Sequence, residues 1–130
     1  MSTFQSVDEA REYFRGDRFA EEAGIALESL EPVTCGMALT ERHSNANGGV
    51  MGGAIFTLAD FAFAVAVNNV HRPTVAQQVS INYLSPPRGC RLTAVARCVK
   101  DGRATCVYNV DVSDDTGRAV AQFVGTGYKL

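Results

Sequence analysis

Metal-binding spacing is the first feature that this sequence lacks. It contains no C-x-x-C pair and only two histidines. Structural zinc sites use four cysteine or histidine ligands, usually in closely spaced pairs, so we expect no metal site. The residues concerned are Cys35, Cys90, Cys98, Cys106, His43 and His71.

The sequence also lacks a strong net charge and an apolar leader. A net charge of −2 creates no field that would attract nucleic acid. The chain begins with polar residues, MSTFQSVDEAR, which include no hydrophobic stretch of the kind found in secretory signals. We therefore expect a cytoplasmic protein with reduced thiols and no nucleic-acid partner.

What is present is the composition of an ordinary folded domain. Of the 130 residues, 46% are hydrophobic and 20% are charged, which excludes a disordered chain. A chain of this length supports one domain with a real core but hardly two. We expect a single domain over residues 1–130, with a helical N-terminal segment over residues 1–23.

Basic residues are concentrated in one part of the chain. Between His71 and Arg103 there are six bases and one acid. One interpretation is that these bases lie on solvated strand faces. The other is that they form a binding strip for an anionic ligand such as a nucleotide phosphate. The six bases are Arg72, Arg88, Arg91, Arg97, Lys100 and Arg103.

Short helices are expected before the first strand. Ser6 and Glu9 have the spacing of a capping box, which predicts a helix that runs to about Phe14 and ends near Gly16. Asp17 is a candidate N-cap for one further helical turn. The first part of the chain is therefore predicted to be helical.

Most of the remaining chain alternates between apolar and polar residues, which predicts strands. The turn signals Asp101-Gly102 and Thr116-Gly117 make the last strands antiparallel. A three-residue loop or bulge at Asp101-Gly102 would pair Cys98 with Cys106 and keep the apolar residues on one face, so we expect that register, with both thiols as neighbouring core residues. The expected strands are Ile25–Leu30, Thr34–Thr40, Val75–Leu84, Arg91–Lys100, Ala104–Ser113 and Ala119–Tyr128.

The most unusual segment is the apolar stretch Ala54–Val67, in which Asp60 is the one charged residue. It is shorter than the roughly 20 residues that a membrane span needs, and a carboxylate at the membrane centre costs about 2.5 kcal/mol or more. A helix that is apolar on nearly every side is instead buried in protein. We therefore expect no membrane association.

One long buried helix with five to six mostly antiparallel strands leaves few architectures. The sheet must curl around the helix to cover it, which predicts an α+β fold. A single curled layer leaves part of the helix uncovered, and this favours a dimer.

Two glycines stand where the central helix is expected to begin. Gly52 and Gly53 leave backbone N–H groups bare at the positive end of the helix dipole. Such a position can bind an anion or stabilise a developing oxyanion. Alternatively, the glycines simply permit a tight turn from loop to helix.

Asp60 is the candidate catalytic acid. An ionised carboxylate is rarely buried without a partner, because its desolvation is costly. The alternative is a structural carboxylate that accepts hydrogen bonds. About 12 Å of helix would separate Gly52 from Asp60, whereas catalysis needs contacts of about 3 Å. Either the two act independently, or Asp60 reaches Gly52 of a second subunit.

The segment around these residues resembles a known family. Residues 43–53, HSNANGGVMGG, are followed four residues later by residues 58–62, LADFA. This pattern resembles the phenylacetate-pathway branch of the hotdog thioesterase superfamily, which has H-x-N-x-x-G-x-x-H-G-G-x-x-x-x-L-A-D-x-A. Residues 79–86, VSINYLSP, also resemble that family's long strand. The resemblance extends from about Gly24 onward.

The resemblance implies a hotdog fold, in which an antiparallel sheet of five to six strands wraps one long helix. It also implies homodimers that share active sites, often paired into tetramers, and hydrolysis of an acyl-CoA thioester. Carried over by position, it implies that the Gly52 N–H polarises the thioester carbonyl. The partner subunit's Asp60 would then act as a base for water or as a nucleophile that forms an anhydride. Asn45 would help to position the carbonyl or the water, although the loop composition alone indicates a turn residue.

Met51 departs from the family pattern, because it stands where the family has histidine. A methionine cannot donate a hydrogen bond or carry a proton, but its apolar thioether can line an acyl pocket. His43 keeps the other histidine position, where a core role and a functional role are equally open. Candidate substrate-binding residues are Met51, Gly53, Gln78, Ser80, Arg88 and Arg91, and aromatic residues expected near an acyl pocket are Phe56, Phe61, Phe63 and Tyr83.

Three functions compete. The first is a hydrolase for acyl-CoA or another acyl thioester, in which coenzyme A enters as part of the substrate rather than as a cofactor. The basic strip from Arg88 to Arg103 is then a candidate for contacting its phosphates. The second is a non-catalytic acyl-CoA binder or sensor, which would have little use for the acid at Asp60. The third is a dehydratase, which ranks last because its chemistry needs a histidine beside the acid where this chain has Met51.

Overall fold

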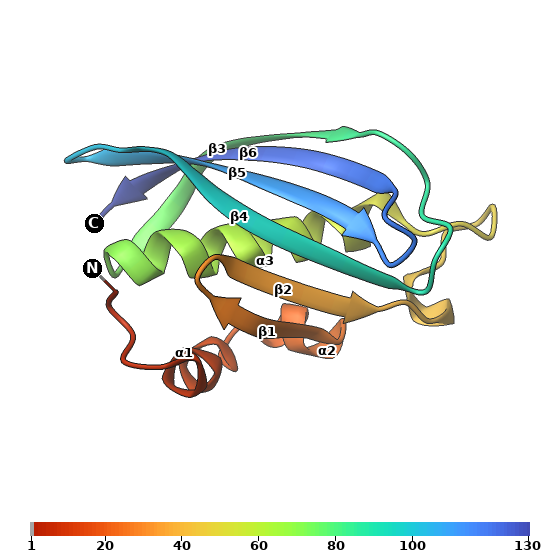
Figure 1. Cartoon of the computed structure of the whole chain (residues 1–130), viewed down its shortest axis with the longest axis horizontal. Coiled ribbons are helices and arrows are strands. Elements are labelled where there is room, and N and C mark those ends of the chain that lie inside the picture. The colour runs from red at the N-terminus through yellow and green to blue at the C-terminus, as the bar shows by residue number, and fades with distance from the viewer. Residues whose placement is uncertain (1) are drawn as a thin grey trace.

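A six-stranded antiparallel sheet curls around one long helix, α3 (Gly52–Val70), as Figure 1 shows. The structure, a computed structural model, describes residues 2–130. The order of strands across the sheet is β1-β2-β4-β5-β6-β3. This confirms the expected α+β hotdog architecture. The strands are β1 (Ile25–Leu30), β2 (Val33–Ala38), β3 (Thr74–Tyr83), β4 (Arg91–Asp101), β5 (Thr105–Asp114) and β6 (Ala119–Lys129).

Two short helices precede the sheet, α1 (Val7–Phe14) and α2 (Arg18–Glu22). They lie beside β1, and α2 also contacts α3 (Figure 1). The Ser6 hydroxyl accepts a hydrogen bond from the Glu9 N–H at 3.1 Å, as the capping-box spacing predicts. The Glu9 carboxylate accepts a hydrogen bond from the N–H of Gln5 rather than from that of Ser6. Asp17 does precede α2, but its side chain accepts no capping hydrogen bond.

The core lies between α3 and the concave face of the sheet. Glycines on β6 allow the helix to approach closely: a Cβ at Gly125 would lie 2.6 Å from the Phe63 ring, and a Cβ at Gly127 would lie 3.5 Å from the Val67 side chain. The Phe63 and Phe123 rings pack at 5.7 Å between centroids. The close approach of α3 therefore depends on missing side chains in the sheet.

The central helix is longer than the apolar stretch that predicts it. With 19 residues, α3 is long and apolar enough to cross a membrane by length and composition alone. The length argument made from the sequence is therefore wrong, but the burial argument stands. The sheet wraps α3, and Phe63, Val65 and Val67 are almost completely buried within the chain. These features make α3 the core helix of the fold.

The β4–β5 hairpin corrects one expected register. A bulge does occur, but it lies within β4 between Cys98 and Lys100, and Cys98 pairs with Tyr108 while Cys106 pairs with Asp101. The bulge absorbs the extra residue before the turn, so the apolar pairs nearer the core stay matched. Cys106 is buried as expected, whereas Cys98 is exposed.

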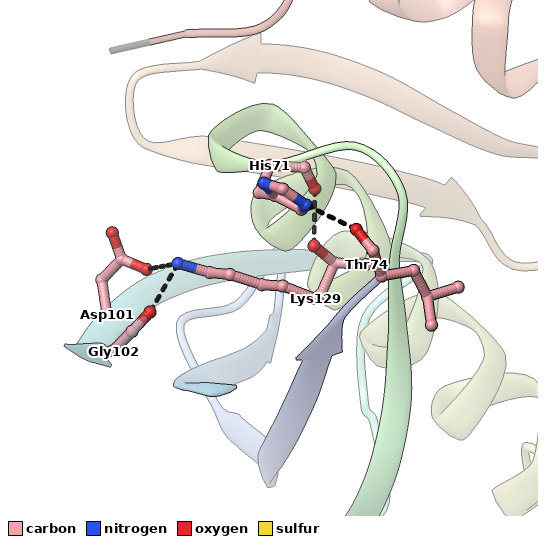
Figure 2. A network of polar contacts seen from close by, with 6 residues as sticks. His71, Thr74, Asp101, Gly102 and Lys129 are labelled. Carbon is pink, nitrogen blue, oxygen red and sulfur yellow. Dashed lines mark hydrogen bonds and ion pairs between the residues drawn. The ribbon is translucent and has the colours of Figure 1, made fainter. Parts of the chain in front are cut away.

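Polar contacts fasten β6 to the neighbouring hairpin and to the end of α3 (Figure 2). The Lys129 ammonium donates to the Asp101 carboxylate at 2.5 Å and to the Gly102 carbonyl at 2.6 Å. His71, which follows α3, bonds through Nε2 to the Leu130 carbonyl at 2.9 Å, and its own carbonyl accepts from the Thr74 hydroxyl. This end of the molecule is therefore structural.

At the other end of the sheet, Asp114 fastens the β3–β4 loop to the β5–β6 turn. Its carboxylate accepts hydrogen bonds from the N–H groups of Arg88 at 2.8 Å and of Gly89 and Arg118 at 3.0 Å. The Thr116 hydroxyl also donates to it. These hydrogen bonds, with that of Thr116 as the largest cause, lower the pKa of Asp114. Asp114 is thus a structural carboxylate with all its partners present.

Candidate active site

The loop before α3 is organised by Asn45. Its side-chain oxygen accepts hydrogen bonds from the N–H groups of Asn47 at 2.9 Å and Gly49 at 3.0 Å. Its side-chain nitrogen donates to the Val50 carbonyl at 3.4 Å. Within the chain, Asn45 therefore shapes the loop that leads to Gly52, which agrees with the turn residue that the loop composition indicates.

His43 has a structural position beneath this loop. Its ring is buried, Nδ1 accepts from the Thr40 N–H at 3.0 Å, and Nε2 bonds to the Ala23 carbonyl at 2.7 Å. This pattern assigns the ring proton to Nε2. The His43 carbonyl in turn accepts from the Met51 N–H at 2.7 Å. Because both ring nitrogens are engaged, His43 is not available to a substrate in this arrangement.

The N-terminus of α3 presents free backbone donors. Among residues 2–130, the N–H groups of Gly52 and Gly53 have no hydrogen-bond acceptor. The Tyr83 hydroxyl, at the end of β3, donates to the Gly52 carbonyl at 3.0 Å. A Cβ at Gly52 would lie 3.2 Å from that hydroxyl. Because Gly52 has no side chain, Tyr83 can hydrogen-bond to the first turn of α3 while the N–H groups of Gly52 and Gly53 remain accessible to a ligand.

A cleft of about 570 Å³ adjoins this helix start. Met51 lies in its wall with half of its surface exposed. Most of the lining is apolar, which suits an acyl group better than a charged one. The lining residues are Phe19, Glu22, Ala23, Arg42, His43, Met51, Gly53, Ala54, Phe56 and Thr57.

Asp60 lies two turns further along α3 and faces α2. It is half-buried in the wall of a cleft of about 240 Å³. Among the described residues, its carboxylate accepts no hydrogen bond and has no ion-pair partner, and the neighbouring Thr57 hydroxyl donates to the Gly53 carbonyl instead. Burial raises the pKa of Asp60 above its ordinary range, and the charge of Asp17 raises it further. These contacts give no support to a structural role for this carboxylate.

The structure does not bring Gly52 and Asp60 together within one chain. Both lie on α3, eight residues apart, which corresponds to roughly 12 Å along a helix axis. The two groups therefore line separate clefts, because Gly52 lies with Tyr83 in the wall of a third cleft of about 290 Å³. Phe19 of α2 lines the Asp60 cleft and the cleft beside Gly53.

The remaining substrate-binding candidates are scattered. Gln78 and Ser80 are exposed on β3, opposite Thr126 and Val124 of β6, on the face of the sheet that points away from α3. Arg88 is exposed in the loop between β3 and β4.

The basic strip is divided by the fold. Arg91 forms an ion pair with Glu28 of β1, and Arg72 lies over the rings of Phe4 and Tyr13. The strand β4 carries the other bases away from the start of α3 (Figure 1). Arg88 is therefore the base of this strip that lies nearest the Gly52 end without an ion-pair partner among the described residues.

The expected pocket aromatics separate into two groups. Phe61 and Phe63 belong to the buried core. Phe56 lines the cleft beside Met51, and Tyr83 contacts Gly52. Of the core pair, Phe63 is almost completely buried, whereas Phe61 also lines the Asp60 cleft.

Two residues near Asp60 were missed by the sequence reasoning. Asp17 and Phe19 enter this region from α2, more than forty positions earlier in the chain. Asp17 gave the signal of a helix cap and nothing in its spacing linked it to Asp60. Residues 2–130 contain no group of three or more histidine, cysteine, aspartate or glutamate side chains that could hold a metal ion.

The sheet that wraps one long helix defines the chain as a hotdog protein. Among residues 2–130, the first amides of that helix and the Asp60 carboxylate have no hydrogen-bond partner. Residues 47–121 match the sequence profile of the thioesterase superfamily. The acyl-coenzyme A thioesterase PaaI of Escherichia coli is 31% identical over 124 residues, which covers 93% of this chain and 89% of the relative. Mouse acyl-coenzyme A thioesterase 13 is 30% identical over 110 residues, with 82% and 79% covered.

Solved structures agree with these sequence matches. The PaaI protein from the E. coli phenylacetic acid degradation operon superposes with a TM-score of 0.87 at 29% identity, covering 95% of this chain and 91% of that one. A Streptococcus pneumoniae thioesterase protein determined with coenzyme A has a TM-score of 0.80 at 30% identity, with 88% and 94% covered. The chain belongs to the thioesterase superfamily, in its PaaI-like hotdog branch.

Proposed function

We propose that this chain hydrolyses acyl-CoA thioesters to a free acid and coenzyme A. The observation that carries the proposal is Asp60, a half-buried carboxylate without a partner among the described residues, on the helix whose first amides are also free. Relatives named acyl-coenzyme A thioesterase and a structural neighbour that contains coenzyme A support this substrate class.

The proposed chemistry uses two parts of α3. The Gly52 N–H donates to the thioester carbonyl and stabilises the negative charge that develops on its oxygen. Asp60 takes a proton from water as the water oxygen bonds to the carbonyl carbon. The carbon–sulfur bond then breaks, and coenzyme A leaves as a thiolate that takes up a proton. In the alternative route, Asp60 attacks directly and water hydrolyses the resulting anhydride.

A homodimer would supply both parts to one site. The separation of about 12 Å requires that Asp60 and Gly52 come from different chains if they act on one substrate. The edge strand β3 supports such an assembly: it is ten residues long and largely exposed, and an exposed edge can pair with another chain. A tetramer of two dimers, and a cytoplasmic location, remain predictions.

Other residues have supporting roles in this proposal. Asn45 acts through the loop that it shapes and is a positioning residue. Met51 and Gly53 line the cleft for the acyl group. Arg88 is the favoured contact for a coenzyme A phosphate, whereas Arg91 would have to leave Glu28 first. Roles for Gln78 and Ser80 remain predictions that require a second subunit at β3.

A non-catalytic acyl-CoA binder is the second candidate, because Met51 replaces a group able to transfer protons. The unpaired Asp60 argues against it. A dehydratase remains last, since both ring nitrogens of His43 are engaged by the backbone.

The test is hydrolysis of short, medium and aryl acyl-CoAs by the wild type and Asp60→Asn. We expect a loss of at least about 100-fold in kcat for Asp60→Asn and wild-type rates for Asp111→Asn, an exposed aspartate on β5. Unchanged turnover in Asp60→Asn would overturn the mechanism. Tight coenzyme A binding without turnover in the wild type would favour the binder.

A further inference from the structure

The helix α2 supports one side of the Asp60 cleft. It is only five residues long, and it packs against both β1 and α3. Gly24, which follows it, has a φ of 84°, a conformation that favours glycine. The contact with α3 places α2 beside the flank of that helix. Asp17 and Asp60 consequently line the same cleft of about 240 Å³.

The carboxylate of Asp17 has no structural use in the described residues. It stands at the N-cap of α2 but accepts no capping hydrogen bond, and the contact to Glu21 comes from its backbone carbonyl. It has no ion-pair partner either. An N-cap aspartate normally turns its carboxylate back to the helix, so the side chain of Asp17 is free to act toward the cleft.

The surrounding charges leave this pair of acids largely uncompensated. Arg18 is the one base among the residues that line the cleft. On the side of Phe61, the bases of α1 and its following loop are paired with acids of α1 and α2. On the side of Phe19, the neighbouring cleft adds one acid and one base. The ion pairs on the Phe61 side are Arg11 with Asp8 and Arg15 with Glu12 and Glu21. The acid and the base on the Phe19 side are Glu22 and Arg42.

We propose that Asp17 is a second acid of the active site, which faces Asp60 across this cleft and makes Asp60 a stronger base. The inference rests on the proposed function, in which Asp60 takes a proton from water. Asp17 forms and breaks no bond in that reaction and is a positioning residue. Its negative charge favours the protonated form of Asp60, and a base that holds its proton more firmly withdraws it from water more readily.

Electrostatics and burial agree with this geometry. Burial is the main reason that the pKa of Asp60 is raised, and the Asp17 charge acts in the same direction. The pKa of Asp17 is raised by burial as well. Two carboxylates in one partly desolvated cleft oppose each other's ionisation.

The test compares Asp17→Asn with the wild type. Asparagine keeps the shape and the capping ability of aspartate but removes the charge. We expect the titration of the Asp60 carboxyl carbon, followed by NMR with labelled aspartate, to move to lower pH. The acid limb of kcat/KM should move with it, so that the variant is faster than the wild type at acidic pH and slower on the plateau.

Two controls separate this effect from general charge or folding changes. Asp8→Asn makes the same change of charge in the same N-terminal segment but away from the cleft, and it should leave both profiles in place. Asp17→Glu keeps the charge and should retain most of the wild-type profile. An Asp60 titration that is the same in Asp17→Asn as in the wild type overturns the inference. If the wild type hydrolyses no thioester, the proposed function fails, but the NMR titration still decides the role of Asp17.

Discussion

At the scale of single residues, two aspartates illustrate how surroundings separate function from structure. Asp114 is surrounded by donors, which lower its pKa, and it holds two turns together. Asp60 has no donor among the described residues, and its pKa is raised by burial and by Asp17. A carboxylate that lowers the stability of its own fold is a candidate for a chemical role.

The first prediction follows from the raised pKa of Asp60. A carboxyl whose folded-state pKa lies above its unfolded value contributes stability while it is protonated and loses that contribution as the pH rises. At neutral pH, Asp60→Asn should therefore raise Tm while it abolishes activity. The gain should shrink as the pH falls toward the unfolded pKa of about 4. Thermal unfolding of both proteins at several pH values checks this, and a lower Tm at neutral pH would indicate a structural carboxylate.

Met51 allows a second prediction at this scale. Its side chain is half-exposed in the cleft beside Gly53, so an imidazole can replace it without entering the core. Met51→His should restore a group that donates hydrogen bonds beside the thioester, and we expect kcat to rise, by up to about 100-fold. Met51→Leu is the matched control, because it changes the apolar group but adds no donor. Equal rates for the two variants would show that the missing histidine does not limit the reaction.

At the scale of elements, apolar alternation and turn signals predicted every strand to within about two residues of the observed ends. The bulge in β4 was not predicted at its true place. Alternation fixes which face a strand buries, but either the turn or the strand can absorb one extra residue. In the structure Cys98 pairs with Tyr108 and the register shifts directly after it, which the alternation of apolar residues does not determine.

The close contact of α3 with β6 gives a third prediction. A Cβ at Gly125 would lie 2.6 Å from the ring of Phe63, which is almost fully buried and cannot yield freely. Gly125→Ala should destabilise the protein by about 1–3 kcal/mol, the usual cost of overpacking. Gly49→Ala is the control, since the atom nearest its Cβ is 3.6 Å away on Asn45. Denaturant unfolding measures both, and equal stabilities would contradict the close packing.

The hydrogen bonds that the Asp114 carboxylate accepts give a fourth prediction, on how stability depends on pH. A carboxyl with a lowered folded-state pKa contributes stability above its unfolded pKa and loses it as the pH falls through the folded value. Asp114→Asn should therefore lower Tm at neutral pH. The difference in Tm between Asp114→Asn and the wild type should become smaller as the pH falls below about 4. A difference in Tm that does not change with pH would mean that the shape of the Asp114 side chain, rather than its charge, stabilises the two turns.

At the scale of the whole molecule, the sequence predicted the fold and the residues of the helix motif but not their surroundings. The glycine pair and Asp60 lie close in sequence, so their spacing on one helix was predictable. The arrival of Asp17 and Phe19 beside Asp60 was not, because it depends on how α2 packs on α3. The arginine strip looked continuous in sequence, yet β4 carries its members to opposite ends of the sheet.

The last prediction tests whether the active site is built from two chains. Gly52→Pro should remove the proposed oxyanion donor with little harm to the helix, because proline suits the first helical position and Met51 has the extended ψ of 134° that a residue before proline needs. Tyr83 must move slightly, since a Cβ lies 3.2 Å from its ring. We expect kcat to fall by about 10²–10³.

Differently tagged Gly52→Pro and Asp60→Asn chains can be co-expressed and the mixed dimer isolated through both tags. In that dimer, one site combines an intact Gly52 with the partner subunit's Asp60, while the other site carries both changes. If each site draws on two chains, the mixed dimer should regain about half of the wild-type kcat. A dimer that carries Asp60→Asn in both chains is the control and should stay inactive. If each chain held a complete site, every site of the mixed dimer would be damaged, and its activity would not exceed the average of the two variants.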